Sequence, residues 1–573
     1  MDKSAILHIP MSQYAYGVDE THVTIRLRAK RDDIDRCTLY FGDRACRQTP
    51  VIFSEQEMEK VYSTSLYDYF EVTLENPYKR LCYYFNLRSG DEQIYYYGDC
   101  FCRGLVDDRS EYFQLPFNHR ADIVNPPTWA KDAVIYNIFP DSFATDKEYI
   151  SEQESSADFN GIEVKGKLGG TIRGIKNNVS YLKDLGINAI YINPIFAAGE
   201  YHKYDLVDYY HVDPCFGSNE EFKQLVETFH ENGLKVIIDG VFNHCGWKFF
   251  AFEDVVQNGE DSRYKDWFYG LKYPVIRPED PEEYPTYECF GYERMMPKLD
   301  LDNPETAEYF INVGKYWVKE FDIDGWRLDV ASEINDGFWR AFYKAVKSEK
   351  NDAIIIGEVW ETACHWLDGT IFDSAMNYDF RKHCRRFFAE ESIDSEEFNN
   401  RVVDMITRYR KQTVYSQLNV LDTHDVSRFL SLCDGDLDRY KLAVIFQMTF
   451  PGMPSIFYGD EKGIQGILEK DYRHPMIWDG KRDELFLFYR ALIELRKAEE
   501  VLRAGDFRTL SAENGSKLYA YERMLGNEKI VIYLNMSEKK MSIDAEPDNV
   551  LLEKGLAGKE LEGKGFVIFK SRG

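Results

Sequence analysis

The spacing of apolar positions divides the chain into three regions. Up to about residue 115, short runs such as residues 23–27 and 81–87 alternate apolar and polar side chains, and turn formers lie between them. Alternation with a period of two is typical of strands that bury one face. We therefore predict a β-sandwich over residues 1–122, followed by a stiff break at residues 125–127, Asn-Pro-Pro.

From Trp129 onward, apolar runs of strand length alternate with helical patterns. The strand-like runs are residues 133–136, 189–192, 235–239, 323–327, 353–357, 418–421 and 455–458. Between the second and third runs, residues 218–232 carry Phe222, Leu225 and Phe229 at helical spacing. Repeated strand–helix units of this length predict an α/β protein with a (β/α)8 TIM barrel over residues 123–497.

Two further segments depart from this rhythm. Residues 245–297, after the third predicted strand, are rich in Trp, Tyr, Pro and acidic residues. We interpret them as a subdomain inserted over the mouth of the barrel. Beyond residue 497 short alternating runs return, as in residues 529–534, and predict a C-terminal β-sandwich over residues 498–573.

Composition narrows the classes of function. The 573 residues are 44% hydrophobic and 15% aromatic, enough for several cores and far from the composition of a disordered chain. A formal net charge of -28 repels nucleic acid and anionic membranes, so neither is an expected partner.

The cysteines and the first residues bear on location and metal binding. Eleven scattered Cys, an odd number, indicate reduced thiols, and Cys100 and Cys102 are too closely spaced for a usual zinc knuckle. The N-terminus lacks the apolar core of a secretory signal, and no stretch reaches the ~18 apolar residues of a membrane span. A cytoplasmic enzyme is the expectation.

Polar clusters follow four of the predicted barrel strands, and these clusters are the strongest indication of chemistry. They are residues 239–244 (Asp239 to His244), 327–329 (Arg327 to Asp329), 357–360 (with Glu358 and Trp360) and 421–425 (with His424 and Asp425). Any one carboxylate at a strand end is as readily explained by a helix cap. In a parallel barrel, however, functional residues gather at the C-terminal ends of strands, and four such clusters in succession exceed what capping explains.

The spacing of two carboxylates predicts glycoside hydrolysis. Asp329 and Glu358 follow adjacent predicted strands, which places them roughly 5 Å apart, the separation of retaining glycosidases. Arg327 faces the same side of its strand as Asp329 and would keep that carboxylate ionised for nucleophilic attack. Glu358 lies between the apolar residues 354–356 and Trp360, surroundings that raise the pKa of a carboxyl acid.

Three further residues complete this predicted site. Asp425 is a third carboxylate, which would favour the developing positive charge and hold sugar hydroxyls. His244 and His424 are candidate hydrogen-bond donors to those hydroxyls.

The four clusters resemble the four signature blocks of the α-amylase superfamily of retaining α-glucan hydrolases, in the same order and over nearly the whole chain. The resemblance implies Asp329 as nucleophile, Glu358 as acid/base and Asp425 as transition-state stabiliser. It also implies that Tyr204, in the run 202–205, stacks on the sugar at the cleavage point. With the residues above, the predicted substrate-binding set is Tyr204, Asp239, His244, Arg327, Glu333, Trp360, Glu361, His424 and Arg473.

Two further blocks resemble a narrower group, the neopullulanases, cyclomaltodextrinases and maltogenic amylases. These blocks are residues 296–300 and residues 330–333, the latter ending in Glu333. The N-terminal β domain is similar to that group's starch-binding-like module, which in relatives mediates dimerisation. The resemblance implies a homodimer that hydrolyses α-glucan oligosaccharides (cyclodextrins, pullulan and maltooligosaccharides) with some transglycosylation. Asp460, Glu461 and Arg473 resemble residues that line the donor side.

Some positions depart from the family pattern. Asp300 stands where an Asn is usual, and Glu361 stands where a His often follows the Trp of the fifth-strand block. Relatives often bind calcium in a loop after the first strand; residues 143–147 and Gly169-Gly170-Thr171 are poor in oxygen ligands here. We therefore expect no cofactor and no metal, with that calcium site lost or weak.

Three alternatives stay open at this point. Glu361, on the acceptor side, keeps a 4-α-glucanotransferase in view. An α-1,6 debranching enzyme would use the same scaffold, although the extra motif of true pullulanases is not visible. A non-catalytic carbohydrate-binding protein belongs to a different class, but such proteins normally lack one of the three carboxylates that this chain has.

Overall fold

The computed structural model describes residues 1–146 and 155–572, which pack as two units. One unit contains Met1–Asn125, Lys382–Tyr415 and the residues from Glu500 onward; the other contains Pro126–Arg381 and Ser416–Glu499. The boundary at Asn125 falls in the predicted Asn-Pro-Pro break.

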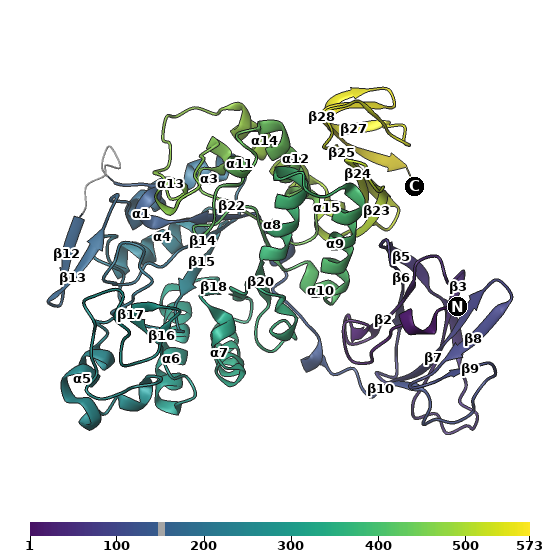
Figure 1. The fold of residues 1–573 in the computed structure, drawn as a ribbon, viewed down its shortest axis with the longest axis horizontal. Coiled ribbons are helices and arrows are strands. Elements are labelled where there is room, and N and C mark those ends of the chain that lie inside the picture. The colour runs from purple at the N-terminus through teal and green to yellow at the C-terminus, as the bar shows by residue number, and fades with distance from the viewer. Residues whose placement is uncertain (147–154, 573) are drawn as a thin grey trace. The chain divides into compact units, whose positions relative to one another are not determined.

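The second unit is built on a closed barrel of eight parallel strands, which confirms the predicted architecture (Figure 1). In barrel order the strands are β11 (Ile135–Ile138), β14 (Ala189–Ile192), β15 (Lys235–Gly240), β18 (Gly325–Leu328), β19 (Ile354–Gly357), β20 (Ser374–Asn377), β21 (Leu418–Val420) and β22 (Met453–Phe457). The sequence pattern gave seven of the eight. It missed β20, whose Ser-Ala-Met-Asn sequence has polar residues at both ends and no apolar run.

Apolar side chains from these strands form one continuous core. Ile237, Ile354, Ile356 and Leu418 are 0% exposed and belong to the same packed cluster. Burying a side chain of this size stabilises the fold by about 1.5–3 kcal/mol. The filled interior leaves chemistry to the strand ends, as is usual for this architecture.

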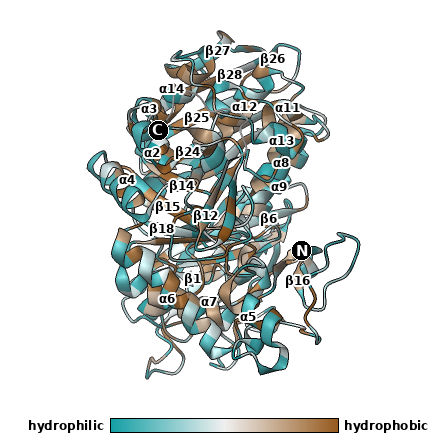
Figure 2. Ribbon diagram, turned by 90° about the vertical axis from the view of Figure 1, so that its left-hand side faces the viewer, coloured by the Kyte–Doolittle hydropathy of each residue, from teal (hydrophilic) through white to brown (hydrophobic). Residues whose placement is uncertain are grey.

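Helices connect the strands on the outside. They are α1 (Pro140–Phe143), α2 (Ile172–Asn177), α3 (Val179–Leu185), α4 (Asn219–Glu231), α6 (Pro304–Phe321), α7 (Asp336–Glu349), α8 (Tyr378–Cys384, which ends in the other unit), α11 (Phe429–Leu432), α12 (Leu437–Thr449), α13 (Glu469–Tyr472) and α14 (Glu484–Ala498). In α4 the predicted stripe is buried, and Ser218 and Glu221 form a reciprocal capping box that fixes the start of the helix. Figure 2 shows hydrophilic and hydrophobic residues alternating around its coil.

Two smaller elements extend from the barrel. A hairpin, β12 (Ser155–Phe159) with β13 (Ile162–Gly166), follows the first helix. The segment after β15 contains α5 (Phe250–Asn258) and the hairpin of β16 (Cys289–Phe290) with β17 (Glu293–Pro297). The bridge His244↔Lys298 ties this segment to the end of the third barrel strand, and the bridge Phe268↔Leu299 closes the segment on itself.

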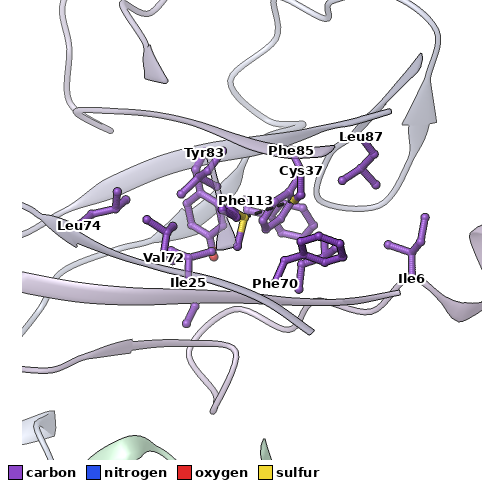
Figure 3. Packing of buried hydrophobic residues seen from close by; sticks show 14 of the residues in the cluster. Ile6, Ile25, Cys37, Phe70, Val72, Leu74, Tyr83, Phe85, Leu87 and Phe113 are labelled. Atoms are coloured by element: carbon purple, nitrogen blue, oxygen red, sulfur yellow. Dashed lines mark hydrogen bonds between the residues drawn. The ribbon is translucent and has the colours of Figure 1, made fainter. Parts of the chain in front are cut away.

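The first unit begins with the predicted β-sandwich. Its sheets have the orders β1-β2-β6-β5 and β4-β3-β7-β8-β9, with β10 paired to β7. The strands are β1 (Ala15–Gly17), β2 (His22–Lys30), β3 (Arg36–Gly42), β4 (Ser54–Glu57), β5 (Glu59–Ser63), β6 (Tyr67–Glu75), β7 (Leu81–Ser89), β8 (Glu92–Tyr96), β9 (Phe101–Cys102) and β10 (Phe113–Leu115). Ile25, Phe70 and Phe85 lie in the core between the sheets (Figure 3).

The rest of the first unit comes from the end of the chain and from one helical segment. The C-terminal β domain contains β23 (Asp506–Ala512), β24 (Leu518–Leu525), β25 (Glu528–Asn535), β26 (Met541–Ser542), β27 (Asn549–Ala557) and β28 (Glu560–Arg572). The helices are α9 (Ser395–Thr407), α10 (Lys411–Val414) and α15 (Glu500–Ala504). Asn399 of α9 donates to Ser63 O and accepts from Thr509, so this helix joins both β domains. No helix within the described residues is long and apolar enough to cross a membrane.

Candidate active site

Register places the predicted carboxylates side by side. In the pairing of β18 with β19, Leu328 is opposite Gly357, so Asp329 and Glu358 are the next residues on adjacent parallel strands. The Asp329 N–H donates to Gly240 O and the Glu358 N–H donates to Leu328 O, both at 2.9 Å. Because neighbouring strands lie about 4.8 Å apart, the two side chains leave the barrel one strand spacing from each other.

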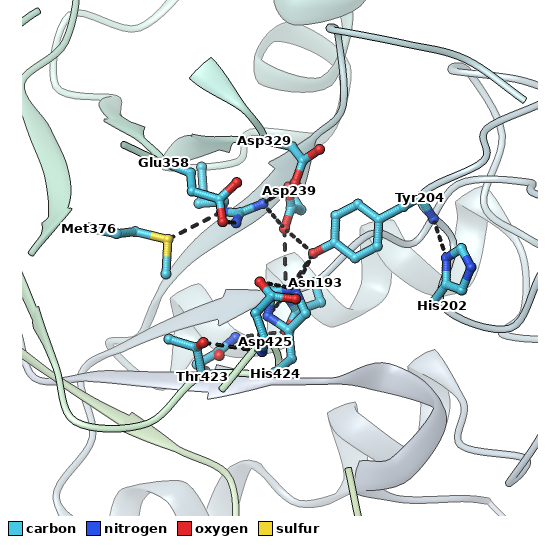
Figure 4. A network of polar contacts seen from close by, with 12 residues as sticks. Asn193, His202, Tyr204, Asp239, Asp329, Glu358, Met376, Thr423, His424 and Asp425 are labelled. Atoms are coloured by element: carbon cyan, nitrogen blue, oxygen red, sulfur yellow. Dashed lines mark hydrogen bonds and ion pairs between the residues drawn. The ribbon is translucent and has the colours of Figure 1, made fainter. Parts of the chain in front are cut away.

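A single guanidinium holds three carboxylates together. Figure 4 labels these carboxylates, Asp239, Asp329 and Glu358. Nη1 of Arg327 lies 2.9 Å from Oδ1 of Asp329 and 2.9 Å from Oδ1 of Asp239, and Nη2 lies 2.7 Å from Oε1 of Glu358. Arg327 and Asp329 thus face the same side, as the strand alternation predicts. Three carboxylates share one buried cation, so the cluster carries an excess of negative charge.

Burial in this excess of negative charge raises carboxyl pKa values. Desolvation, together with the nearby Glu358, raises the pKa of Asp329 well above its ordinary value, and Arg327 opposes the rise. The same two causes raise the pKa of Asp425 to about 7. The sequence predicts that Arg327 keeps Asp329 ionised, but burial has a larger effect on the pKa of Asp329 than Arg327 has. A bound cationic transition state would restore the balance of charge.

The residue after Asp329 adopts a strained backbone conformation. Val330 has φ 44° and ψ 44°, a left-handed conformation that is a genuine outlier for a β-branched residue. Its N–H donates to Oε2 of Glu358 at 2.9 Å, so the turn also orients the second carboxylate. Strain of this kind costs about 1–3 kcal/mol and is typical of functional sites.

Above the carboxylates lies a cavity of about 510 Å³. It is lined by His202, Tyr204, His244, Phe290, Met296, Asp329, Val330, Ser332, Glu333, Glu358, Trp360, Glu361, Asp425, Glu469 and Arg473. All three predicted catalytic carboxylates and six of the nine predicted binding residues are therefore brought together. Asp239, Arg327 and His424 are 0% exposed and lie behind the lining, where they hold other side chains.

A polar network supports one wall of the cavity. The Tyr204 hydroxyl lies 2.5 Å from Nε2 of His424 and 3.1 Å from Oδ2 of Asp239, and the Tyr204 and His424 rings are stacked at 5.5 Å. The amide of Asn193 lies 2.9 Å from Nδ1 of His424, and Nε2 of that ring lies 3.0 Å from Asp425. Burial holds the pKa of His424 well below its ordinary value, so the ring is neutral.

His244 presents an unused polar atom to the cavity. Its Nε2 is buried without a hydrogen-bond partner, and its ring stacks on Phe290 at 5.0 Å. Burial, with a smaller effect of Lys298, lowers the pKa of His244 to about 3. An orphaned polar atom in a binding cavity is normally satisfied by a ligand or water.

Aromatic and charged side chains form the rim. Trp360 is 51% exposed and stacks on Tyr378 with 3.8 Å between ring centroids. Glu333 lies 3.3 Å from Lys298. Arg473 pairs with Glu469 at 2.7 Å and lies 3.7 Å from Asp425.

Sequence reasoning did not single out several lining residues. Phe290 and Met296 come from the hairpin of the inserted segment, and Glu469 comes from α13. The aromatic character of residues 245–297 was a signal for the first, but no pattern distinguished Phe290 from its neighbours. The structure also places Asp460 and Glu461 outside the lining: Asp460 pairs with Arg428 at 2.8 Å, and Tyr136 donates to Glu461 at 2.8 Å.

The described part of the loop after the first barrel strand offers few ligands for calcium. Its one carboxylate in the described part, Asp146, lies 3.4 Å from the guanidinium of Arg173, and Lys147 lies outside the described residues. The carboxylate of Asp141 accepts backbone N–H groups from residues 167–169. Within the described residues, no cluster of three His, Cys, Asp or Glu ligand atoms lies at this loop. These residues do not fit the oxygen cage that calcium prefers.

Comparison with known proteins gives matches along the whole chain. Residues 137–479 match the family described as "Alpha amylase, catalytic domain", and residues 1–119 match "Alpha amylase, N-terminal ig-like domain". The chain is 41% identical over 562 residues to a cyclomaltodextrinase of Geobacillus thermopakistaniensis, covering 95% of this chain and 94% of that protein. It is 40% identical over 558 residues to neopullulanase 2 of Thermoactinomyces vulgaris, and the match covers 94% of this chain and 92% of that protein.

Solved structures give the same result. A cyclomaltodextrinase superposes with a TM-score of 0.89 at 35% identity and covers 100% of this chain and 98% of its own. The type III pullulan hydrolase from Thermococcus kodakarensis superposes with a TM-score of 0.83 at 28% identity, and the match covers 99% of this chain and 100% of that one.

Proposed function

The chain belongs to the alpha-amylase family and is a glycoside hydrolase, and from that premise we propose that it cleaves α-1,4-glucosidic bonds in cyclodextrins, pullulan and maltooligosaccharides with retention of configuration. The observation that carries this proposal is the pair Asp329 and Glu358 on adjacent strands, held by one guanidinium at the floor of a cavity. Retaining enzymes need two carboxyl groups about 5–5.5 Å apart, and one strand spacing supplies that separation.

The proposed reaction has two displacements. In the first, Glu358 gives its proton to the glycosidic oxygen, the bond from this oxygen to the anomeric carbon breaks, and a carboxylate oxygen of Asp329 bonds to that carbon. In the second, Glu358 takes a proton from water, whose oxygen attacks the anomeric carbon and releases Asp329. The Val330 N–H donates to Oε2 of Glu358, and Nη2 of Arg327 lies 2.7 Å from Oε1, so both carboxyl oxygens are held in place at the cavity floor.

Charge development explains the third carboxylate. An oxocarbenium-like transition state places positive charge on the sugar, beside a cluster that already carries excess negative charge. Asp425 lies at the cavity with Arg473 on one side and neutral His424 on the other. We assign it to stabilising that charge, and we assign the free Nε2 of His244 to a sugar hydroxyl.

The substrate class rests on the cavity rim and on the relatives. Trp360, supported by Tyr378, and Phe290, supported by His244, offer flat apolar faces to sugar rings. The matched proteins are named for cyclomaltodextrin and pullulan substrates. Glu361 also lines the cavity, and we assign it to the acceptor side, where its carboxylate would affect the balance between hydrolysis and transglycosylation.

Initial rates on β-cyclodextrin, pullulan and maltoheptaose test the proposal. The wild-type protein should release reducing sugar, and Asp329→Asn should lose nearly all activity while it stays folded. Absence of release from all three substrates by the folded wild type would overturn the proposal. On maltotriose, a predominance of products longer than the substrate over net hydrolysis at early times would assign the protein as a transferase.

We also propose a cytoplasmic homodimer that needs no calcium. A relative from Bacillus subtilis is named an intracellular maltogenic amylase, and the ion pair of Asp146 with Arg173 occupies the one described carboxylate of the loop. Light scattering tests the dimer: a mass near twice 67.2 kDa is expected, and a mass of one chain at micromolar concentration contradicts it.

A further inference from the structure

Two thiols and two carboxylates converge at one edge of the N-terminal β-sandwich, in the first unit and apart from the barrel. Cys102 ends β9 and pairs with Tyr95 of β8, and Cys100 lies two residues before it. Alternate residues of an extended chain point to the same side, and the two Sγ atoms lie 3.6 Å apart. The Sγ of Cys100 lies 3.5 Å from Oε2 of Glu111.

Asp99 completes the group. Ligand atoms of Asp99, Cys100 and Glu111 lie within 4.8 Å of one another. Asp99 is exposed, so its side chain is free to rotate toward the other three, which are partly buried. Within the described part of the chain, neither Asp99 nor Glu111 has a lysine or arginine partner at ion-pair distance.

Two of these distances are close to the edges of a tetrahedron around zinc. Zn–S bonds of ~2.3 Å at the tetrahedral angle separate two sulfur atoms by about 3.8 Å, and with a Zn–O bond of ~2.0 Å they separate sulfur from oxygen by about 3.5 Å. The observed 3.6 Å and 3.5 Å lie close to these two edges. Cys102 is outside the group of ligand atoms that lie within 4.8 Å of one another, so its side chain would turn toward the ion on binding. Calcium and magnesium prefer all-oxygen sites, whereas thiolates select zinc-like cations.

Backbone hydrogen bonds tie together the two segments that carry these side chains. The Gly98 N–H donates to Glu111 O at 2.7 Å, and the Tyr97 N–H donates to Cys100 O at 2.9 Å. A Cβ on Gly98 would lie only 3.0 Å from Glu111 O, so the close approach of the two segments favours glycine there. The side chains are thus held on two tied segments, one from the end of the β8–β9 hairpin and one before β10.

We propose that Asp99, Cys100, Cys102 and Glu111 bind one zinc ion, which links the β8–β9 hairpin to the segment before β10. Zinc would bind both sulfurs as thiolates, and their protons would pass to solvent. The carboxylates supply the two ligands that a second cysteine pair would otherwise provide.

Zinc titration of the full-length protein, reduced and stripped of metal, tests this proposal. A chromophoric chelator reports competition for zinc, and Co²⁺ absorbance reports tetrahedral thiolate ligation. Wild type should bind one equivalent of zinc and show the cobalt–thiolate band. Cys100→Ser and Cys102→Ser should each weaken zinc binding at least about 100-fold, beyond the 10–100-fold that loss of an outer-shell partner costs.

Two further variants control for folding and for thiols in general. Glu111→Gln keeps both thiols and should weaken zinc binding about 10-fold or more. Cys289→Ser removes a partly buried thiol of the barrel unit and should bind zinc like wild type. Among the described residues, this thiol hydrogen-bonds only to the Gly291 carbonyl. Glycoside hydrolysis should be unchanged in all of them, which separates this result from the proposed function. Zinc binding that is absent in wild type, equal in the Cys100 and Cys289 variants, or insensitive to Glu111→Gln would overturn the proposal.

Discussion

Asp425→Asn should lower the activity and raise the free energy of unfolding, and the gain in stability should depend on pH. Burial and the nearby Glu358 raise the pKa of Asp425 to about 7 in the folded protein. Asparagine has nearly the same shape but no charge to desolvate. The variant should therefore be more stable than wild type wherever Asp425 is ionised in the wild-type unfolded chain.

The size of this gain follows from the pKa difference. A pKa near 7 in place of the ordinary ~3.9 corresponds to about 4 kcal/mol of folding free energy at pH 8. The side chain is 29% exposed, and solvent screening reduces the expected gain to about 2 kcal/mol. Because the pKa of this acid is raised in the folded protein, ionised Asp425 lowers the free energy of unfolding of the wild type. This destabilisation is fully present above pH 7 and disappears as the pH falls toward 4.

Calorimetry measures the gain in stability, and kinetics measures the loss of activity. The barrel unit of Asp425→Asn should melt a few degrees higher than wild type at pH 8 and at the same temperature at pH 4. Its kcat/KM on maltoheptaose should fall about 10³-fold, equivalent to about 4 kcal/mol. Asp266→Asn, at an exposed position, should change neither quantity. A gain of equal size at both pH values, or a loss of stability at pH 8, would refute the electrostatic reasoning.

Three other changes have defined outcomes. Trp360→Ala removes the ring stacked on Tyr378 and should lower kcat/KM on β-cyclodextrin about 10-fold. Trp366→Ala, at a position outside the cavity lining, should leave kcat/KM unchanged. Equal effects of the two variants would mean that Trp360 does not bind the substrate. Glu361→Gln removes the rim carboxylate and should change the ratio of transfer products to glucose formed from maltotriose, without loss of total turnover. An unchanged ratio would mean that Glu361 does not act on the acceptor side. Calcium added to metal-free protein should leave both the melting temperature and the rate unchanged, and a rise in either would mean that calcium binds.

The architecture was predictable from sequence because buried barrel strands are nearly continuous apolar runs. The predicted strand at residues 189–192 coincides with β14, and the predicted helix at 218–232 contains α4 with its two caps. The strand β20 was not predictable, since a four-residue strand with Ser374 and Asn377 at its ends has no apolar signature. Its place is set by pairing with β19 and β21, which is tertiary information.

The carboxylates were predictable for a different reason. A charge at the end of an apolar run is conspicuous, and strand adjacency then fixes which charges meet. The lining contributed by Phe290 depends on how the inserted segment folds back over the third strand, which no local pattern encodes. The raised pKa of Asp329 was likewise outside the sequence argument, because the number of carboxylates around Arg327 emerges only in three dimensions.

Trapping the covalent intermediate tests the central claim most directly. Glu358→Gln keeps the shape of the acid/base residue but cannot activate water, so maltosyl fluoride, whose leaving group needs no proton, should glycosylate the enzyme and then stall. Digestion and mass spectrometry should find a maltosyl adduct on Asp329. An adduct on any other residue of the folded variant, or none at all with release of the inverted anomer, would contradict the assignment of Asp329 as the nucleophile of a retaining enzyme.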